Sequence, residues 1–295
     1  MPYVLLQAKI FYMDLIPVVV KDEAFIAAVD KYQHDEKNFH LWWLGQSGYL
    51  LLWKGKRILI DPYLSDSLTK KYAVTEKPHI RMSERVVDPQ LLKNISIVTS
   101  SHNHTDHLDG ETLIPVIKNN PGITFIIPEA NRKFVSERAQ VSQDFATGLS
   151  DGESITIGEF TFFGVPAKHN EIERDEKGHC KFMGYVINFG KWSIYHSGDT
   201  LLYDNMVEIL KPFKIDIALL PINGNDPARG VAGNLNGKEA AQLGKAIGAQ
   251  IVIPCHYNMF AFNTADPDEF VFEAKKINQP YYILEPGGHF SSSIL

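Results

Sequence analysis

Four side chains of the kinds that bind metal ions, His102, His104, Asp106 and His107, stand within six residues of one another. They follow an apolar stretch, 95–99, that predicts a strand, and they precede a predicted helix. Because alternate residues of an extended chain share a side, the first two histidines are expected to point the same way. Imidazole nitrogens and carboxylate oxygens are ligands of zinc, manganese and iron. The pattern therefore predicts a metal-binding loop.

A polar loop whose histidines face solvent or cap the helix is the alternative interpretation, and for a single histidine it is the usual one. Four ligand-type residues packed into one loop after an apolar strand favour the metal. One loop cannot complete a site for two ions, so further ligands should follow later strands. His169, Asp199 and His256 each stand just beyond an apolar run. These runs are predicted as strands over 160–165, 192–196 and 251–254.

The elements that must position these side chains are short strands and amphipathic helices. Further strands are predicted over 41–44, 49–53, 57–60, 154–157, 182–188 and 217–220, and helices over 21–32, 109–118, 129–138, 201–210, 237–247 and 267–276. Hairpins first, and then strands alternating with helices, favour two sheets with helices packed outside. No linker-like segment interrupts the chain. We expect one domain over 41–295, preceded by an extension, 1–40, that packs on it.

The gross composition is that of an ordinary globular protein. The 295 residues are 44% hydrophobic and 22% charged, which allows a sizeable core. The net charge of −6 gives no support to a broad basic surface for long nucleic acids. No apolar run reaches the roughly 18 residues of a membrane span, and no signal-peptide pattern begins the sequence. Two cysteines make no disulfide framework, so a cytoplasmic protein is expected.

The ligand series resembles that of the metallo-β-lactamase superfamily, and the stretch 59–62, Leu-Ile-Asp-Pro, is similar to its early strand-and-aspartate signature. The resemblance implies an α+β fold, a four-layer αββα sandwich of two mixed sheets with metals at one edge. It implies that His102, His104 and His169 bind one ion, that Asp106, His107 and His256 bind the other, and that Asp199 bridges them. Asp61 is expected to hold a ligand histidine in one tautomer. A simple Asp-Pro turn is a compatible interpretation of the same residues.

A narrower similarity concerns the second half of the chain, which looks like the L-ascorbate-6-phosphate lactonase branch. The segments that carry it are 196–200, 221–230, 252–260 and 265–267. That branch acts on a phosphorylated sugar-acid lactone, and it implies a homo-oligomer, which no residue pattern here shows. Arg229 is the first candidate for an anionic group of the substrate, because arginine holds phosphate bidentately. Asn225 and Tyr257 are the other candidates for substrate binding, with a solvated loop and core packing as their alternatives.

The predicted function is a metal-dependent hydrolase of a small anionic substrate, a lactone or a phosphoester. Two divalent ions, zinc first with manganese or iron as alternatives, would share a hydroxide that attacks the substrate directly. Asp106 would orient that nucleophile or take its proton, beside the bridging Asp199. A phosphodiesterase acting on nucleotides or phospholipid head groups is a second interpretation, and iron redox chemistry at the same ligands is a third. A non-catalytic metal-binding protein of the same fold is the alternative from another class.

Overall fold

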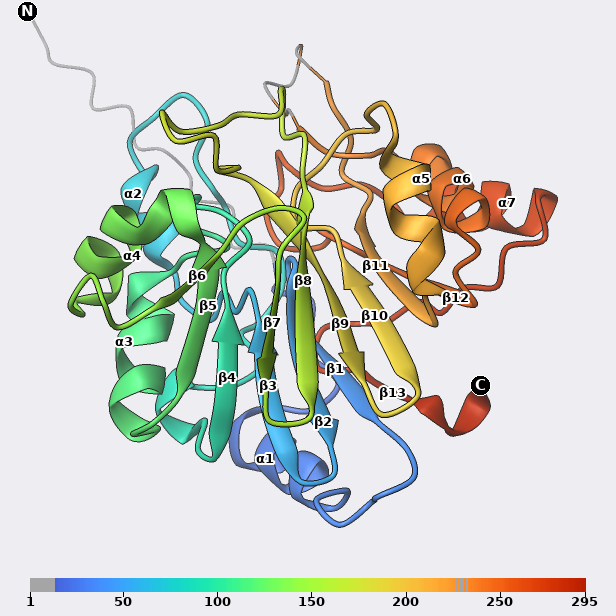
Figure 1. Ribbon diagram of the computed structural model, residues 1–295. Helices are drawn as coiled ribbons and strands as arrows, with labels where there is room; N and C mark the ends of the chain where they lie inside the picture. Colours follow the sequence, from blue (N-terminus) through green and yellow to red (C-terminus); the bar gives the residue numbers. More distant parts are fainter. Residues whose placement is uncertain (1–13, 227, 229–230, 232) are drawn as a thin grey trace, which may run out of the picture.

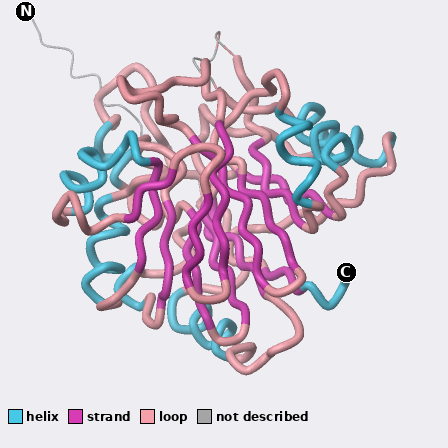
Figure 2. The backbone as a smooth tube through the Cα atoms, viewed as in Figure 1, coloured by secondary structure: helices cyan, strands magenta, loops and turns pink. Residues whose placement is uncertain are grey.

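The computed structural model describes residues 14–226, 228, 231 and 233–295. Two β-sheets face each other at the centre of the molecule, and helices lie on their outer sides, as Figures 1 and 2 show. The first sheet has seven strands in the order β13 (His289–Ser291), β1 (His40–Gly45), β2 (Gly48–Trp53), β3 (Lys56–Ile60), β4 (Ile95–Thr99), β5 (Thr124–Pro128) and β6 (Thr147–Leu149). The second has six, in the order β12 (Ile251–Cys255), β11 (Ile217–Pro221), β10 (Trp192–His196), β9 (Met183–Phe189), β8 (Phe160–Pro166) and β7 (Ser154–Ile157).

Helices cover the outer face of each sheet, which makes the αββα sandwich that the sequence predicts. The α-helices of the described residues are α1 (Asp22–Asp30), α2 (Ser67–Lys71), α3 (Gly110–Asn119), α4 (Arg132–Ala139), α5 (Met206–Leu210), α6 (Gly237–Ile247) and α7 (Asp268–Lys276). Short 3-10 helices are η1 (Pro89–Leu91), η2 (Glu129–Asn131), η3 (Lys211–Phe213) and η4 (Ser292–Ile294). Figure 1 shows α3 and α4 beside the first sheet and α5, α6 and α7 beside the second.

The strand β1 shows how one short sequence fills two cores. All six of its residues are buried, and alternate side chains point to opposite faces of the sheet. Leu41 and Trp43 join the core between the two sheets. Trp42 and Leu44 pack on the outer side, among residues of α1, α3 and α4. A continuous apolar run is therefore required here, because both faces of the strand are covered.

The described part of the N-terminal segment lies against the first sheet. Phe25 and Val29 of α1 are buried, and the Phe25 ring meets the edge of Trp42 with 6.4 Å between ring centroids. Ahead of the helix, the backbone amide of Ile16 donates to the carbonyl of Met82 at 2.7 Å. No helix in the described ranges combines the length and the apolar character that crossing a bilayer would need.

Strand direction decides which turns meet at one edge. In the first sheet β1 and β3 both run antiparallel to β2, and β4 runs parallel to β3. In the second sheet β10, β11 and β12 are parallel, and β8 runs the same way because both β8 and β10 pair antiparallel with β9. The carboxyl ends of these strands lie together at the upper edge in Figure 1. Every predicted ligand follows one of them.

Several predicted elements differ from the observed ones. The helix expected over 201–210 begins only at Met206, because Leu201 pairs with Lys168 and Asn205 has a left-handed φ of 65°. The helix expected over 129–138 is divided into η2 and α4. Strands β5, β6 and β13 and helix α2 were not predicted. The helix over 237–247 was predicted correctly, and its cap residue Asn236 forms a full capping box with Glu239.

Candidate metal centre

The loop between β4 and α3 folds back on itself so that its ligand-type side chains converge. The backbone amides of His107 and Leu108 both donate to the carbonyl of His104, at 3.1 and 2.8 Å. The hydroxyl of Ser100 donates to the carbonyl of His102 at 2.8 Å. These bonds turn the chain tightly between His104 and Leu108, so that Asp106 and His107 face the same region as the two histidines before them.

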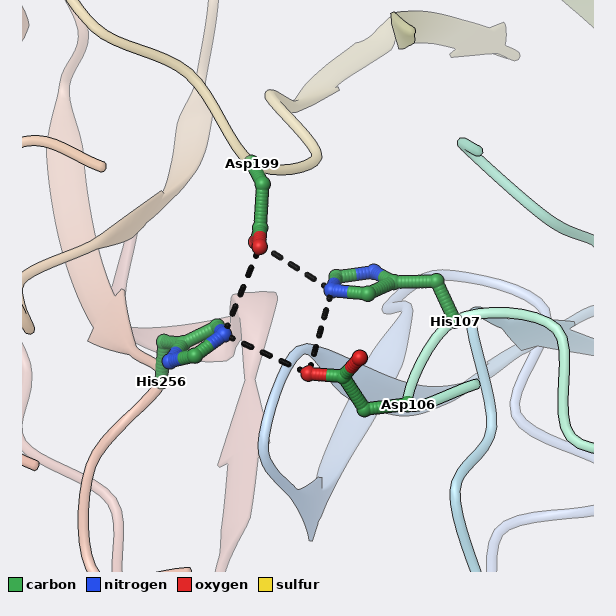
Figure 3. A group of neighbouring side chains, drawn as sticks. All are labelled: Asp106, His107, Asp199 and His256. Atoms are coloured by element: carbon green, nitrogen blue, oxygen red, sulfur yellow. Dashed lines mark ion pairs between the residues drawn. The ribbon is translucent and has the colours of Figure 1, made fainter. Parts of the chain in front are cut away.

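The first group of ligand-type side chains consists of Asp106, His107, Asp199 and His256 (Figure 3). The Nε2 atom of His107 lies 3.2 Å from an oxygen of Asp199, and the Nε2 atom of His256 lies 3.5 Å from the other. Oδ2 of Asp106 stands 3.7 Å from the first imidazole and 3.6 Å from the second. Bonds of about 2.1 Å to one cation place neighbouring ligand atoms roughly 3 to 3.5 Å apart. The spacing suits a single divalent ion.

The second group consists of His102, His104 and Asp199. The ring centroids of its two histidines are 4.6 Å apart, and the ring of His169 lies 4.7 Å from that of His104. Asp199 belongs to both groups, as a residue that bridges two ions must. The structure thus brings all seven predicted ligands to one place, although they come from the ends of four strands in two sheets.

The donor atoms fit bound cations for a further reason. Nε2 of His102, Nε2 of His107 and Oδ1 of Asp199 are buried without a hydrogen-bond partner among the residues that the structure describes, although the last two atoms form an ion contact of 3.2 Å with each other. A buried polar atom without a partner costs about 1–3 kcal/mol. Three such atoms directed at one small region are explained if each gives its lone pair to a metal ion. The residues present therefore fit a pair of divalent cations.

Burial and neighbouring charge shift the pKa values of these groups. Burial, together with the neighbouring His107 and His104, holds the pKa of His102 well below its usual value, so its imidazole is neutral. Burial also opposes the charged form of His256, but Asp199 and Asp106 outweigh it and raise its pKa to about 9. The carboxyl of Asp199 has a pKa well below the usual range, because His107 and His256 overcome the effect of burial. The carboxylate of Asp199 and the neutral imidazole of His102 are in the form that binds a divalent cation, whereas His256 carries a proton that such a cation would displace on binding.

Asp61, which directly follows β3, binds the ring nitrogen of His107 that faces away from the metal region. Its Oδ2 accepts from Nδ1 of His107 at 2.8 Å, and its Oδ1 accepts from the amide of Ser101 at 3.0 Å. The hydroxyl of Thr99 donates to it as well, at 3.1 Å. Because Nδ1 carries the proton in this contact, Nε2 is left free to face the metal region. Asp61 is thus placed where the sequence predicts its support of a ligand histidine.

The comparisons with known proteins decide the family. A family model described as "Beta-lactamase superfamily domain" matches residues 56–257, which include all seven ligand positions. The chain belongs to the metallo-β-lactamase superfamily. It is 32% identical to a UPF0173 metal-dependent hydrolase of Methanosarcina mazei, over 83% of this chain and 95% of the relative. A UPF0173 metal-dependent hydrolase of Caldivirga maquilingensis is 29% identical over 84% of this chain and 96% of that one. The chain is a member of this family of metal-dependent hydrolases.

Solved structures agree on the superfamily fold. A metallo hydrolase from the hyperthermophilic archaeon Ignicoccus hospitalis superposes with a TM-score of 0.63 at 23% sequence identity. The match covers 86% of this chain and 98% of that one. The likeness extends through nearly the whole of the other protein, so the two-sheet sandwich described above is the superfamily's fold.

A cavity of about 500 Å³ opens over the candidate metal centre of this superfamily member. Its floor includes His104, Asp106, His169, Asp199 and His256. The walls come from the α2 region, the loop after β12 and helix α4, and they present both cations and aromatic rings. The residues of these walls include Lys71, Tyr72, Lys77, His79, Arg138, Phe260 and Phe262. No local pattern in the sequence predicts a binding role for these residues, because lysines and aromatic residues on a loop more often serve solvation and packing.

Two of the three predicted substrate-binding residues, Tyr257 and Asn225, do not line this cavity. Tyr257 does not line it: the side chain is buried, its hydroxyl donates to the carbonyl of Leu284, and its ring packs 4.5 Å from that of Trp43. The prediction that Tyr257 donates a hydrogen bond to a substrate is therefore wrong, because its hydroxyl already donates to a backbone carbonyl in the core. Asn225 is exposed and does not line the cavity either. Arg229 lies outside the described residues, whereas Val231 and Asn234 of the same loop do line the cavity.

Gln46 is the residue at the centre that the sequence interpretation missed. It stands in the turn between β1 and β2, and its Nε2 lies 2.8 Å from Oδ2 of Asp106 and 2.9 Å from Nε2 of His256. The sequence does contain a pattern that could have pointed to Gln46. The turn joins the predicted strands 41–44 and 49–53, and antiparallel pairing places it at the edge where the strand before Asp61 ends.

Proposed function

We propose that this chain hydrolyses a small anionic metabolite, a phosphorylated lactone or a phosphoester, at a centre of two divalent ions. The observation that carries the proposal is the pair Lys71 and Lys77 at the cavity wall. Both are exposed, both line the cavity above the ligand cluster, and neither forms an ion pair within the described part of the chain. Arg138 lines the same cavity. Unpaired cations around a pocket attract an anionic substrate and hold it there.

The residues at the floor supply the chemistry. Two divalent ions bound there would lower the pKa of a water molecule toward neutrality and polarise the carbonyl or phosphoryl oxygen under attack. Asp106 lines the cavity and is partly exposed, so its carboxylate can accept the proton released by the attacking water. Asp199, almost fully buried, fixes the spacing of the two ligand groups. We assign these two aspartates the catalytic roles.

The lactone is favoured by the similarity of segments 196–200 and 252–260 to the L-ascorbate-6-phosphate lactonase branch. These segments carry two of the floor residues, Asp199 and His256. A phosphate on such a substrate would be attracted to the two lysines while the lactone carbonyl reaches the floor. Zinc, manganese and iron all suit the His and Asp donors, and the proposal is a binuclear site for one of them.

A phosphodiesterase acting on nucleotides is the second candidate, and a specific feature favours it. His79 stacks on Tyr72 with ring centroids 4.2 Å apart, and it meets the edges of Phe260 and Phe262 at 5.1 and 4.6 Å. All four rings line the cavity. A nucleobase stacks on aromatic side chains with about 1–3 kcal/mol per base, so this wall suits a nucleotide.

The test is a substrate panel run on the wild type, Lys71→Ala, Lys77→Ala and Lys70→Ala. Lys70 is the matched control, since it adjoins Lys71 but pairs with Glu111 and does not line the cavity. We expect phosphorylated lactones to be hydrolysed faster than the same lactones without phosphate. We expect KM for the phosphorylated substrate to rise about tenfold in the two cavity variants, equivalent to about 1.4 kcal/mol, with no rise in the control. Turnover of nucleotide diesters alone would favour the second candidate, and no turnover with metals bound would favour a binding protein.

A further inference from the structure

Gln46 reaches the metal cluster from a turn that carries none of the predicted ligands. Its side chain is fully buried, and its carboxamide nitrogen is 2.8 Å from Oδ2 of Asp106 and 2.9 Å from Nε2 of His256. Those two atoms belong to the group formed by Asp106, His107, Asp199 and His256. The end of the Gln46 side chain therefore stands beside two of the four donor atoms of one cation position.

The backbone fixes this side chain in place. The carbonyl of Gln46 accepts two hydrogen bonds, from Nε1 of Trp43 and from the backbone amide of His256, both at 2.9 Å. Its φ is 51°, in the left-handed region that costs a residue with a side chain about 1–2 kcal/mol. His256 lies in the same region, with φ 64°. Gln46 and His256, both in the left-handed region and joined by a backbone hydrogen bond, are thus held so that both side chains are directed at the cluster.

The two ends of the carboxamide differ in what they can do here. With Nε2 beside Asp106, the Oε1 atom is buried and has no hydrogen-bond partner in the described structure. A half-turn of the amide group exchanges oxygen and nitrogen without moving another atom. When a cation takes the lone pairs of Asp106 and His256, an N–H group beside them directs its positive hydrogens at the ion. The oxygen in that position instead adds one more donor atom to the ion, while the amide nitrogen takes the buried place that the oxygen leaves.

The distances agree with direct coordination. For bonds of about 2.1 Å, two ligand atoms at right angles on one ion lie roughly 3 Å apart. The separations of 2.8 and 2.9 Å from Asp106 and His256 match that value. We propose that Oε1 of Gln46 is a fifth protein ligand of the ion held by Asp106, His107, Asp199 and His256. The proposal rests on the binuclear centre proposed above.

This ligand would change which metal the position prefers. With Gln46 the protein supplies two nitrogens and three oxygens, and carbonyl and carboxylate oxygens suit manganese better than they suit zinc. Zinc sites in proteins are commonly satisfied by four ligands. Loss of the amide oxygen should therefore weaken the binding of manganese more than the binding of zinc.

The experiment measures binding of Mn²⁺ alone, by calorimetry and by the electron paramagnetic resonance of free manganese, with the metal-stripped full chain. We expect two equivalents in the wild type, and in Gln46→Leu the affinity of one of them should fall about tenfold or more. Gln46→Asn is the second variant, because asparagine tolerates the left-handed backbone but is too short to reach the ion. Gln279→Leu is the matched control. It removes another buried glutamine, whose Nε2 donates to the carbonyls of Ala249 and Pro280, away from the cluster.

A crystal structure of the manganese-loaded wild type, with the ions located by anomalous scattering, separates a ligand from a mere support. The proposal expects Oε1 of Gln46 within about 2.4 Å of an ion. An amide that keeps its nitrogen toward Asp106, with no atom of Gln46 bound to the ion, would overturn it. So would two unchanged affinities in both Gln46 variants. A wild type that binds no manganese, zinc or iron would overturn the binuclear centre itself, which is a different result from the loss of Gln46 alone.

Discussion

At the scale of single residues, the centre depends on side chains whose partners are far away in the sequence. Asp199 contacts His107 through one oxygen and His256 through the other, and it also lies with His102 and His104. Asp199 is placed by strand β10, which ends at His196, and by Gly198, which directly precedes it. The residue types and their places after apolar runs were sufficient to single out the seven side chains that the structure brings together. Gln46 and the cavity lysines were missed: the place of Gln46 at the metal edge follows only once its two neighbouring strands are paired, and lysines on a loop give no local signal at all.

The support of His107 by Asp61 leads to a prediction at this scale. Asp61→Asn keeps the size of the side chain but removes the anionic acceptor for Nδ1 of His107. Loss of such support commonly costs about tenfold to a hundredfold in metal affinity, and we expect that loss for Zn²⁺ or Mn²⁺ measured by competition with a chelator.

Asp216→Asn is the control for this variant. Asp216 is also a buried aspartate, but it accepts from the amide of Ser193 and from Gln250, and its place just before β11 puts it at the other end of the strands. Equal metal affinity in Asp61→Asn and the wild type would show that Asp61 does no more than end a strand.

At the scale of elements, the helices and strands that the sequence predicts differ physically from those that it misses. The helix α6 was predicted because the residues of its apolar face and its cap residue Asn236 form a local pattern within one short stretch of sequence. Strands β6 and β13 have three residues each, too few to show an alternation. The pairing of β13 with β1 joins His289 to Trp42 across most of the chain, and local pattern does not contain such information. Short edge strands therefore stay hidden, although the missed strand β5 shows that a five-residue strand with four buried residues can escape prediction as well.

The approach of β10 to the metal loop gives a prediction for this scale. Gly198 has φ 59°, and a Cβ added there would lie 2.7 Å from the carbonyl of Met183 and 2.8 Å from Cβ of Ser101. Gly198→Ala must therefore shift the chain next to Asp199. We expect it to lower both the free energy of unfolding in urea and the affinity for two metal ions.

Gly158→Ala in the β7–β8 hairpin is the matched control, because its φ of 60° is nearly the same and a Cβ added there meets nothing within 4 Å. In both variants an alanine in the left-handed region should lower the free energy of unfolding by roughly 1–2 kcal/mol. Only Gly198→Ala should lose more than this. Equal losses in the two variants, with metal binding intact, would contradict the close packing at Gly198.

At the scale of the whole molecule, the two sheets place the chemistry at one edge and leave the rest of the sandwich to hold it. Away from the metal centre, His40 and His289 lie with their ring nitrogens 3.1 Å apart, and His289 stacks on Trp42 at 4.5 Å. Burial, together with His40 and Lys31, lowers the pKa of His289 to about 4. This cluster joins the N-terminal segment to the C-terminal strand β13, so its charge bears on the stability of both.

The sign of the pH effect follows from that pKa. His289 has a usual pKa of about 6.5 when the chain is unfolded, and a lower one when it is folded. Its contribution to stability is therefore complete above pH 6.5 and is lost as the pH falls toward 4. Asp35 and Lys31 are the charged groups near the pair, and Asp35 bonds His40 at 3.1 Å.

The test replaces His289 by phenylalanine, which can keep the stacking on Trp42 but cannot take a proton. We expect the free energy of unfolding of His289→Phe, measured in urea with a chelator present, to fall less between pH 6.5 and 4 than that of the wild type. Parallel curves for the two proteins in this range would mean that His289 does not couple folding to pH.

The metal content of the full chain, measured by mass spectrometry after reconstitution with zinc, manganese or iron, tests the binuclear centre most directly. The wild type should hold two ions per chain. His102→Ala should hold one, because it removes a ligand of one position only, and Asp199→Ala should lose affinity at both positions. Two ions in the wild type and one in His102→Ala are the result we predict. A wild type that binds no ion with any of the three metals, or a His102→Ala variant that keeps two, would contradict it.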